Sequence, residues 1–201
     1  MRMIKRLFDI IVALAIVILL LPLIAFVSLL ILLRDGRPVF YVSERMKAPG
    51  QGFALLKFRT MHPDKKDMGA TGAHKNNRIT KTGLMLRKSR IDEIPQLWNI
   101  LVGDMSFVGP RPPLRRYVEK FPELYSRVLH NRPGVTGLAS VYFHRHEEWL
   151  LRNATSTEET EETYCRSCVP RKAKLDLIYQ EKQNLCMDIM LMLKTVIKRL
   201  R

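Results

Sequence analysis

The chain has 201 residues, which is room for one domain with a hydrophobic core and some appendages. Its 34 lysines and arginines outnumber 19 aspartates and glutamates, so the formal net charge is +15. A field of that sign attracts nucleic acid, anionic lipid and phosphorylated substrates alike, or serves only to keep the protein soluble. With only three cysteines, the composition argues against a disulfide framework and indicates a reducing compartment.

Two of these cysteines, Cys165 and Cys168, have the spacing of a metal-binding pair, and His144 and His146 lie upstream. A structural zinc site needs four ligands, and no second Cys-x-x-Cys or His-x₃₋₅-His element completes the set. We therefore interpret the cysteines as ordinary thiols.

The most apolar part of the chain, residues 10–33, contains no charged side chain. As a helix rising ~1.5 Å per residue, it exceeds the ~30 Å hydrocarbon core of a bilayer. The simplest interpretation is therefore one transmembrane span. The length of the run and the lack of an Ala-x-Ala-like site after it argue against a cleavable signal peptide.

Pro22 and the flanking charges favour a second interpretation of this run. Pro22 clashes with the carbonyl of Ile18 and bends or breaks a helix there, leaving halves of roughly twelve residues that are too short to cross. A re-entrant helix and a kinked span therefore remain alternatives, and Asp9 is placed to cap the helix or pair with a nearby arginine. Basic residues lie at both ends of the run and place both in the cytoplasm: Arg2, Lys5, Arg6, Arg34 and Arg37.

Beyond the apolar run, two stretches have the composition of β-strands. Residues 38–43 and 53–58 are rich in β-branched and aromatic side chains, and a Pro- and Gly-containing turn, residues 48–52, separates them. We predict a hairpin that carries Lys57 and Arg59 on the same side of its far end. Charges on a solvated strand face are the ordinary explanation of such a pair.

The middle of the chain is expected to form a mobile loop and two helices. Residues 62–77 are polar and predict the loop. One helix should begin near Thr82, and a second should cover residues 94–101, with a proline in its first turn. Asp92 and Glu93 then lie just before the second helix, where its dipole and free N–H groups favour anions.

The remaining elements are short. Residues 155–163 form an acidic, exposed stretch, and residues 186–200 form an amphipathic helix with a basic C-terminal end. Its apolar face is expected to pack on the protein core rather than on a bilayer surface. We also expect a turn-rich loop over residues 132–137 and short helices over residues 113–118, 122–130 and 147–152.

The adjacent carboxylates Asp92 and Glu93 point to chemistry only through their context, because an Asp-Glu dipeptide is common on protein surfaces. A basic stretch precedes the pair, and a Gly-Pro-Arg-Pro turn containing Arg111 follows it. An aspartate with a pKa near ~3.9 is an ionised nucleophile at neutral pH. Mg²⁺ on the neighbouring carboxylate, together with arginines, would screen its repulsion from a phosphate.

Residues 86–112 resemble the signature of the bacterial sugar transferases, monotopic polyprenyl-phosphate phosphoglycosyl transferases that initiate glycan assembly. The matching residues are Leu86-Arg87-x₄-Asp92-Glu93-x-Pro95-Gln96-Leu97-x-Asn99-x₃-Gly103-Asp104-Met105-Ser106-x-Val108-Gly109-Pro110-Arg111-Pro112. Further matching blocks are Lys57-Phe58-Arg59-Thr60-Met61, Arg132-Pro133-Gly134-Val135-Thr136-Gly137, and Asp176-x₂-Tyr179 followed by Asp188 and Thr195.

The resemblance implies an α+β fold that is mostly helical. A re-entrant membrane helix-break-helix would cover residues 1–36, and a cytosolic catalytic domain with a small β-hairpin and amphipathic interfacial helices would cover residues 37–201. The protein is then expected at the bacterial inner membrane, with the catalytic domain on the cytoplasmic face. Without additional N-terminal membrane segments, it would be a minimal catalytic core.

The implied reaction is ping-pong and uses Mg²⁺ held by Asp92 and Glu93. Asp92 attacks the β-phosphate of a UDP-sugar, UMP leaves, and polyprenyl (undecaprenyl) phosphate takes the phosphosugar from Asp92. The expected partners are these two substrates and membrane lipids, without nucleic acid, and the oligomeric state is left open, a dimer included. The implied substrate-binding residues are Lys57, Arg59, Arg87, Arg111, Arg132 and Asp176.

Three departures from the family pattern bear on specificity and on the anchor. Residues 138–144 replace the usual Ala-Gln-Val-Asn-Gly-Arg continuation, and residues 153–170 resemble an insertion, so we expect sugar specificity to lie in residues 140–170. Leu21 stands where a serine often precedes the helix-breaking proline, which weakens the re-entrant interpretation.

Two other classes of function account for the charge. A membrane-tethered nucleic-acid binder would use the basic surface, although the chain has no recognised nucleic-acid-binding fold signature and no aromatic stacking motif. A membrane-anchored scaffold would bind anionic lipid. Neither uses a nucleophile, so both predict that Asp92→Asn leaves the activity in place.

Overall fold

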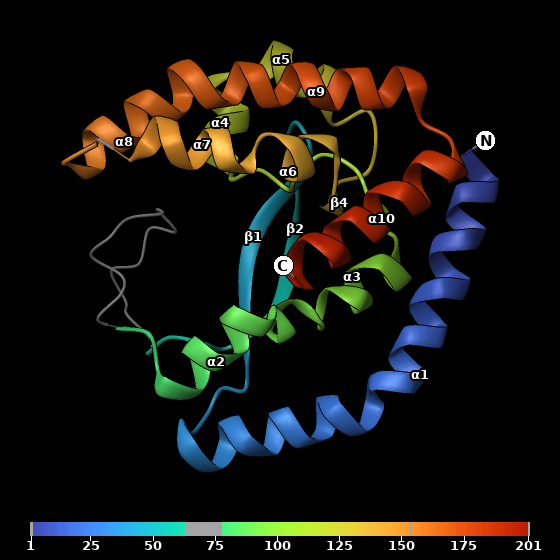
Figure 1. Cartoon of the computed structure of the whole chain (residues 1–201), viewed down its shortest axis with the longest axis vertical. Helices are drawn as coiled ribbons and strands as arrows, with labels where there is room; N and C mark the ends of the chain where they lie inside the picture. Colours follow the sequence, from blue (N-terminus) through green and yellow to red (C-terminus); the bar gives the residue numbers. More distant parts are fainter. Residues whose placement is uncertain (1, 63–77, 153, 201) are drawn as a thin grey trace. The chain divides into compact units, whose positions relative to one another are not determined.

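The computed structural model describes residues 2–62, 78–152 and 154–200 (Figure 1). It is mostly helical with small two-stranded sheets, as predicted. Almost all of the predicted loop 62–77 lies outside the described residues. The helices are α1 (Arg2–Arg34), α2 (Lys81–Ser89), α3 (Gln96–Val102), α4 (Arg115–Lys120), α5 (Pro122–Val128), α6 (Leu138–Tyr142), α7 (His144–Leu151), α8 (Thr157–Thr163), α9 (Val169–Lys182) and α10 (Leu185–Leu200). The strands are β1 (Phe40–Ala48), β2 (Gln51–Phe58), β3 (Ser106–Val108) and β4 (Gly134–Thr136).

The chain divides into two compact units. The larger unit comprises Met1–Arg6, Arg45–Phe53 and Gly103–Arg201, and the smaller unit comprises Leu7–Glu44 and Ala54–Val102. Strands β1 and β2 pair as the predicted hairpin, and each strand contributes residues to both units. Both strands are longer than predicted on the turn side. The predicted boundary between an anchor and a catalytic domain at residue 36 is a functional division that stays a prediction.

Helix α1 is continuous from Arg2 to Arg34 and bends along its length (Figure 1). Pro22 lies inside it, and a proline there removes one backbone hydrogen bond without ending the helix. The predicted break is therefore a bend within one helix. By length and composition α1 is the one described helix that could cross a membrane.

The second half of α1 belongs to the core of the smaller unit. Val27 and Ile31 are buried with Phe58 of β2 and Leu86 of α2. Helix α2 begins at Lys81, slightly earlier than predicted, because the Thr80 hydroxyl accepts a hydrogen bond from the Gly83 N–H at 2.8 Å. Partly buried side chains complete this core: Leu23, Ile24, Val39, Ile91 and Ile94.

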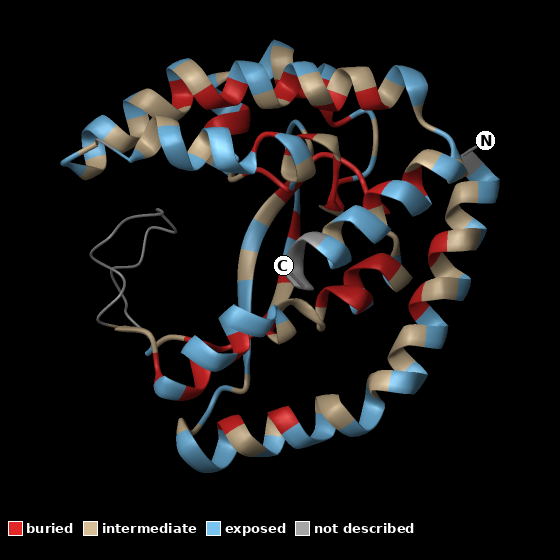
Figure 2. Ribbon diagram, in the orientation of Figure 1, coloured by how far each residue is buried: buried red, intermediate tan, exposed pale blue. Residues whose placement is uncertain are grey.

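The larger unit is built around α9, which packs against α5 and α6. Its buried positions recur every three or four residues and form one face of the helix (Figure 2). This helix was not predicted, because only two of those four positions are aliphatic: Val169, Ala173, Asp176 and Tyr179. The rest of this core comes from Met46, Tyr117, Val118, Tyr125, Val128, Leu129 and Cys165.

Strands β3 and β4 form a parallel pair in which Ser106 is aligned with Gly134 and Val108 with Thr136. The prediction of a loop over residues 132–137 is therefore wrong for the three residues of β4. A Cβ on Gly109 would lie 2.2 Å from the Arg132 carbonyl oxygen. The two backbones approach so closely that only glycine fits at this position.

The other helix predictions are confirmed within a few residues. Helix α5 begins at the predicted residue, α4 begins two residues late and α7 begins earlier than expected. The acidic stretch forms α8 and contains no buried residue, in line with the expectation of an exposed segment. Helix α10 packs on β3 and β4, as favoured, and its Leu191 is fully buried. The helix also exposes an apolar face: Ile189, Met190, Leu193, Val196 and Ile197.

Candidate active site

Asp92 and Glu93 lie in a single 3₁₀ turn, Ile91–Glu93, between α2 and α3. The chain enters this turn through Arg90, whose φ of 60° and ψ of 16° are left-handed and whose N–H closes α2 on the Arg87 carbonyl. The turn leads directly into α3. The prediction that the carboxylate pair precedes a helix near Pro95 is confirmed.

Asp92 is buried, with 7 % of its surface exposed, and its Oδ1 has no hydrogen-bond partner among the described residues. Burial and then the charge of Glu93 raise the pKa of Asp92 above 3.8, against the lowering effect of Lys57, Arg90 and Arg87. A buried carboxylate oxygen with no partner is costly unless something binds it. This oxygen is therefore available to a metal ion or to an electrophile.

Glu93 is held by two cations on one oxygen. Its Oε1 accepts from Lys57 Nζ at 3.0 Å and from Arg90 Nη1 at 3.2 Å. Lys57 comes from the end of β2, so a residue that is distant in sequence balances the negative charge of Glu93. The structure thus brings Lys57 and Glu93 together, and it adds Arg90, which the resemblance did not mark.

Two further side chains of the smaller unit position this cluster. Arg87 donates through Nε to Thr60 Oγ1 at 2.8 Å and lies close enough to lower the pKa of Asp92. Asn99 of α3 accepts from the Leu56 N–H at 3.0 Å and donates to the Ala54 carbonyl at 2.7 Å. This buried amide thereby fixes the strand that carries Lys57 against the helix that follows the carboxylates.

Arg59 does not share this cluster in the structure. Strand β2 ends at Phe58, and the buried Arg59 guanidinium donates to the carbonyls of Arg37 at 2.8 Å and Gly36 at 2.7 Å, and also to that of Asp35. It therefore satisfies backbone groups just after α1. The expectation that it shares a strand face with Lys57 is wrong, because the strand has ended. Its role in substrate binding stays a prediction.

Arg111 and Arg132, both in the larger unit, lie next to the β3–β4 pair. The Gly134 N–H donates to the Pro110 carbonyl at 2.8 Å, so the two Arg-Pro segments are held side by side through their backbones. Both arginines are exposed. Their chain positions suit phosphate contacts, and that assignment stays a prediction.

Asp176 caps a helix in the structure. Its carboxylate, 8 % exposed, is hydrogen-bonded to the backbone of Ala139 in the first turn of α6, while its Oδ1 has no partner among the described residues. Burial raises its pKa from 3.8 to about 7, against the lowering effect of Lys172. Sequence reasoning missed this capping, because residues 138–142 give no helical signal of their own.

The other residues of that block join distant segments of the chain within the larger unit. Asp188, 2 % exposed, accepts from Lys5 Nζ at 2.6 Å and from the Tyr179 hydroxyl at 2.5 Å. The Val108 carbonyl oxygen lies 3.3 Å from the same hydroxyl. Thr195 and Thr136 share a hydroxyl hydrogen bond of 2.6 Å, which ties α10 to β4. None of these contacts was predicted, since each joins segments distant in sequence.

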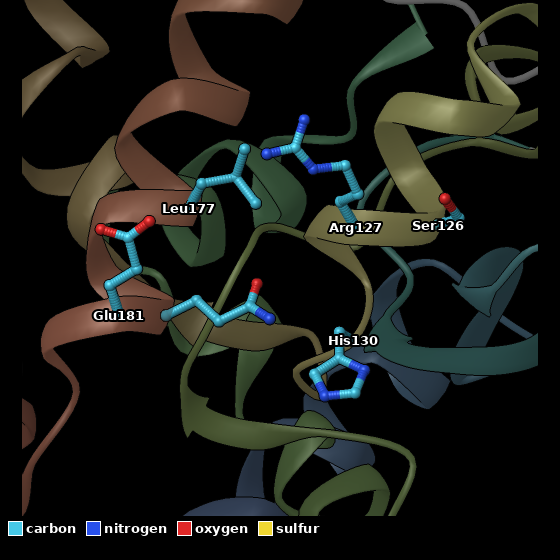
Figure 3. A pocket seen from close by; sticks show the side chains of 6 residues that line it. Ser126, Arg127, His130, Leu177 and Glu181 are labelled. Atoms are coloured by element: carbon cyan, nitrogen blue, oxygen red, sulfur yellow. The ribbon is translucent and has the colours of Figure 1, made fainter.

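A separate open cavity of about 540 Å³ lies between α5 and α9 (Figure 3). Arg127 and His130 line one side, and Glu181 lies on the other (Figure 3). None of the residues that line it belongs to the predicted site. The remaining lining residues are Ser126, Leu177 and Gln180.

The whole chain matches one family of known proteins. The family model described as bacterial sugar transferase matches residues 1–201. The "Uncharacterized sugar transferase EpsL" of Bacillus subtilis (strain 168) is 36 % identical over 194 residues, covering 96 % of this chain and 86 % of that protein.

Two further relatives have names that state a reaction. The "UDP-glucose:undecaprenyl-phosphate glucose-1-phosphate transferase" of Caulobacter vibrioides is 35 % identical over 198 residues, covering 96 % of this chain and 68 % of that protein. The "UDP-N-acetylgalactosamine-undecaprenyl-phosphate N-acetylgalactosaminephosphotransferase" of Aeromonas hydrophila is 32 % identical over 199 residues, covering 96 % of this chain and 43 % of that protein.

Proposed function

Because this chain belongs to the bacterial sugar transferase family, we propose that it transfers a sugar 1-phosphate from a UDP-sugar to undecaprenyl phosphate and releases UMP. The reaction is the first membrane step in the assembly of a glycan or exopolysaccharide. The related enzymes are named for different sugars, glucose and N-acetylgalactosamine, so the comparisons leave the sugar of this chain open.

The observation that carries the proposal is the state of Asp92. Its buried Oδ1 has no hydrogen-bond partner among the described residues, while three cations lie near enough to act on its pKa. The carboxylate attacks the β-phosphorus of the UDP-sugar, the bond between that phosphorus and the bridging oxygen breaks, and UMP leaves with the electron pair. The phosphosugar stays covalently bound to Asp92. An oxygen of undecaprenyl phosphate then attacks the same phosphorus, and the bond between that phosphorus and the Asp92 carboxylate breaks.

The surrounding charges fit this reaction. Lys57, Arg87 and Arg90 offset the repulsion between a carboxylate and a diphosphate, and they stabilise negative charge as UMP departs. Arg111 and Arg132, in the larger unit, stay predicted phosphate contacts, since a guanidinium matches phosphate geometry.

Mg²⁺ suits the donor set of this turn. Asp92 Oδ1 and the carboxylate of Glu93 would supply oxygen ligands. Among the described residues there is no group of three or more His, Cys, Asp or Glu that could hold a metal. Mg²⁺ accepts such sites, because it is commonly bound by one or two carboxylates with water and substrate phosphates. When bound, it supplies Lewis-acid stabilisation of the diphosphate.

The contacts at the two ends of α1 support a re-entrant anchor. Lys5, at one end, is paired with Asp188 in the larger unit, and Ile31, near the other, is buried in the core of the smaller unit. A crossing helix would separate these groups across the bilayer. Strands β1 and β2, which contribute to both units, would then have to cross as well. A polar two-stranded hairpin with open edges cannot lie in hydrocarbon. These contacts therefore support an anchor that enters and leaves on one face, and the basic residues at both of its ends favour the cytoplasmic face.

A UDP-sugar panel tests the function. Wild type, Asp92→Asn and the exposed Glu119→Gln control are purified in detergent and given undecaprenyl phosphate and Mg²⁺. Wild type and control should release UMP from one UDP-sugar, and Asp92→Asn should lose at least about 10³-fold in rate, as expected for removal of a nucleophile. Release of UMP by Asp92→Asn at the wild-type rate would exclude the mechanism. No release by the wild type with any sugar would exclude the function.

A further inference from the structure

Arg90 has an unusual backbone for a long, charged side chain. It is the one non-glycine residue with a positive φ among those described, in a conformation that glycine adopts freely. In that conformation it ends α2 and begins the turn that carries Asp92 and Glu93. The left-handed residue therefore sits at the hinge between a helix and the reacting carboxylates.

The Arg90 side chain shares its carboxylate oxygen with another cation. Glu93 Oε1 accepts from Lys57 at 3.0 Å and from Arg90 at 3.2 Å. The side chain of Glu93 is 9 % exposed and that of Lys57 21 %, whereas that of Arg90 is 41 % exposed. Lys57 is thus the better-buried partner, and Arg90 is the partner that can leave towards solvent.

The charges around Asp92 favour a change of partner by Arg90. Among the described residues that act on the pKa of Asp92, Asp92 itself and Glu93 supply two negative charges, while Lys57, Arg87 and Arg90 supply three positive ones. Within this set, Lys57 can stay on Glu93 when Arg90 binds another acceptor. A diphosphate arriving at Asp92 offers more acceptor oxygens than a shared carboxylate oxygen does.

We propose that Arg90 is a substrate-contacting residue that exchanges Glu93 for a phosphate oxygen of the UDP-sugar. This inference rests on the proposed function and adds a residue that the resemblance does not assign. The exchange pairs the guanidinium with the diphosphate and frees a lone pair of Glu93 at the moment when substrate binds. Lys57 remains on Glu93 and keeps its carboxylate in place.

The test measures UDP binding by titration calorimetry in the presence of Mg²⁺, in an Asp92→Asn background that prevents attack on the β-phosphate. Arg90→Asn removes the charge and suits the left-handed backbone, and Arg90→Lys keeps a charge without the planar fork. Lys88→Gln is the matched control, because it removes one exposed positive charge from the same last turn of α2. Arg90→Gly provides a second backbone-compatible variant if Arg90→Asn folds poorly.

We expect Arg90→Asn to weaken UDP binding about 10- to 100-fold, in line with the loss of a charge-assisted hydrogen bond. Arg90→Lys should recover part of that loss, and Lys88→Gln should stay within about twofold of its parent. In the Asp92-intact series, the KM for the UDP-sugar should rise more than kcat falls.

Two results would overturn the inference. The first is that Arg90→Asn binds UDP with an affinity within twofold of its parent. The second is that Lys88→Gln loses as much UDP affinity as Arg90→Asn, because the loss would then follow from removing any nearby positive charge. Wild-type UMP release separates the two proposals. If it is present while Arg90→Asn binds UDP normally, only the role of Arg90 fails, and if the wild type neither binds UDP nor releases UMP, both fail.

Discussion

Replacing Asp176 by Asn should remove the contribution of one buried carboxyl group to the pH dependence of the free energy of unfolding. Asp176 is buried, its pKa is raised to about 7, and its one oxygen without a partner cannot be solvated. In the unfolded chain the same group titrates near 3.8. The folded state therefore binds this proton more tightly than the unfolded state does.

The sign and the size of the effect follow from that difference. The stabilisation from this group is fully present below about pH 4 and is lost as the pH rises to about 7, at about 1.4 kcal/mol per pH unit and roughly 4 kcal/mol in all. Asn does not titrate and still presents an oxygen to the Ala139 backbone. The stability of Asp176→Asn relative to wild type should therefore rise with pH across this window and level off above it.

Thermal unfolding of detergent-solubilised protein measures this change. For a chain of this size about 1 kcal/mol corresponds to roughly 2–4 °C, so the Tm difference between variant and wild type should grow by roughly 5–9 °C from pH 5 to pH 7. Glu119→Gln, with its exposed side chain, should show no such trend. A Tm difference that stays constant from pH 5 to pH 8 would refute the reasoning.

Two other predictions concern the backbone and the anchor. Gly109→Ala should lower the free energy of unfolding by about 1–3 kcal/mol or more, because its Cβ would lie 2.2 Å from the Arg132 carbonyl oxygen; Gly50→Asn, in open space, should change it little in the same denaturation assay. Single cysteines at Met3 and Arg37, in a Cys186→Ser background, should both react with a membrane-impermeant reagent only in vesicles whose cytoplasmic face is outward. Reaction from opposite faces would mean that α1 crosses the membrane.

The sequence predicted those parts of the fold whose causes are local. Pro95 predicts the helix after the carboxylates, and the Pro-Gly turn at Pro49 predicts the hairpin. Both predictions hold because a proline restricts its own backbone conformation. Helix α9 was not predicted, because Asp176 and Tyr179 interrupt its apolar face. Strand β4 escaped because three residues are too few to show an alternating pattern.

The candidate site was predictable in its residue types and not in its pairings. The Asp92-Glu93 dipeptide and the basic stretch before it are visible in sequence, as is Lys57. The partner of each is not, since the Lys57–Glu93 pair depends on β2 lying against α3 through Asn99. The left-handed backbone of Arg90 has no sequence signal either, because arginine rarely adopts it.

The residues that match the family pattern perform two physically different tasks. Asp92, Glu93 and Lys57 bring charge to the proposed reaction, whereas Arg59 satisfies carbonyls after α1 and Asn99 joins a strand to a helix. A substitution of either kind can abolish activity, the first by removing chemistry and the second by loosening the segment that holds it. Loss of activity alone therefore cannot assign a residue of this pattern to catalysis. Thermal stability measured beside activity separates the two tasks, because a charge that serves only the reaction leaves Tm nearly unchanged, while loss of the buried contacts of Arg59 or Asn99 lowers it.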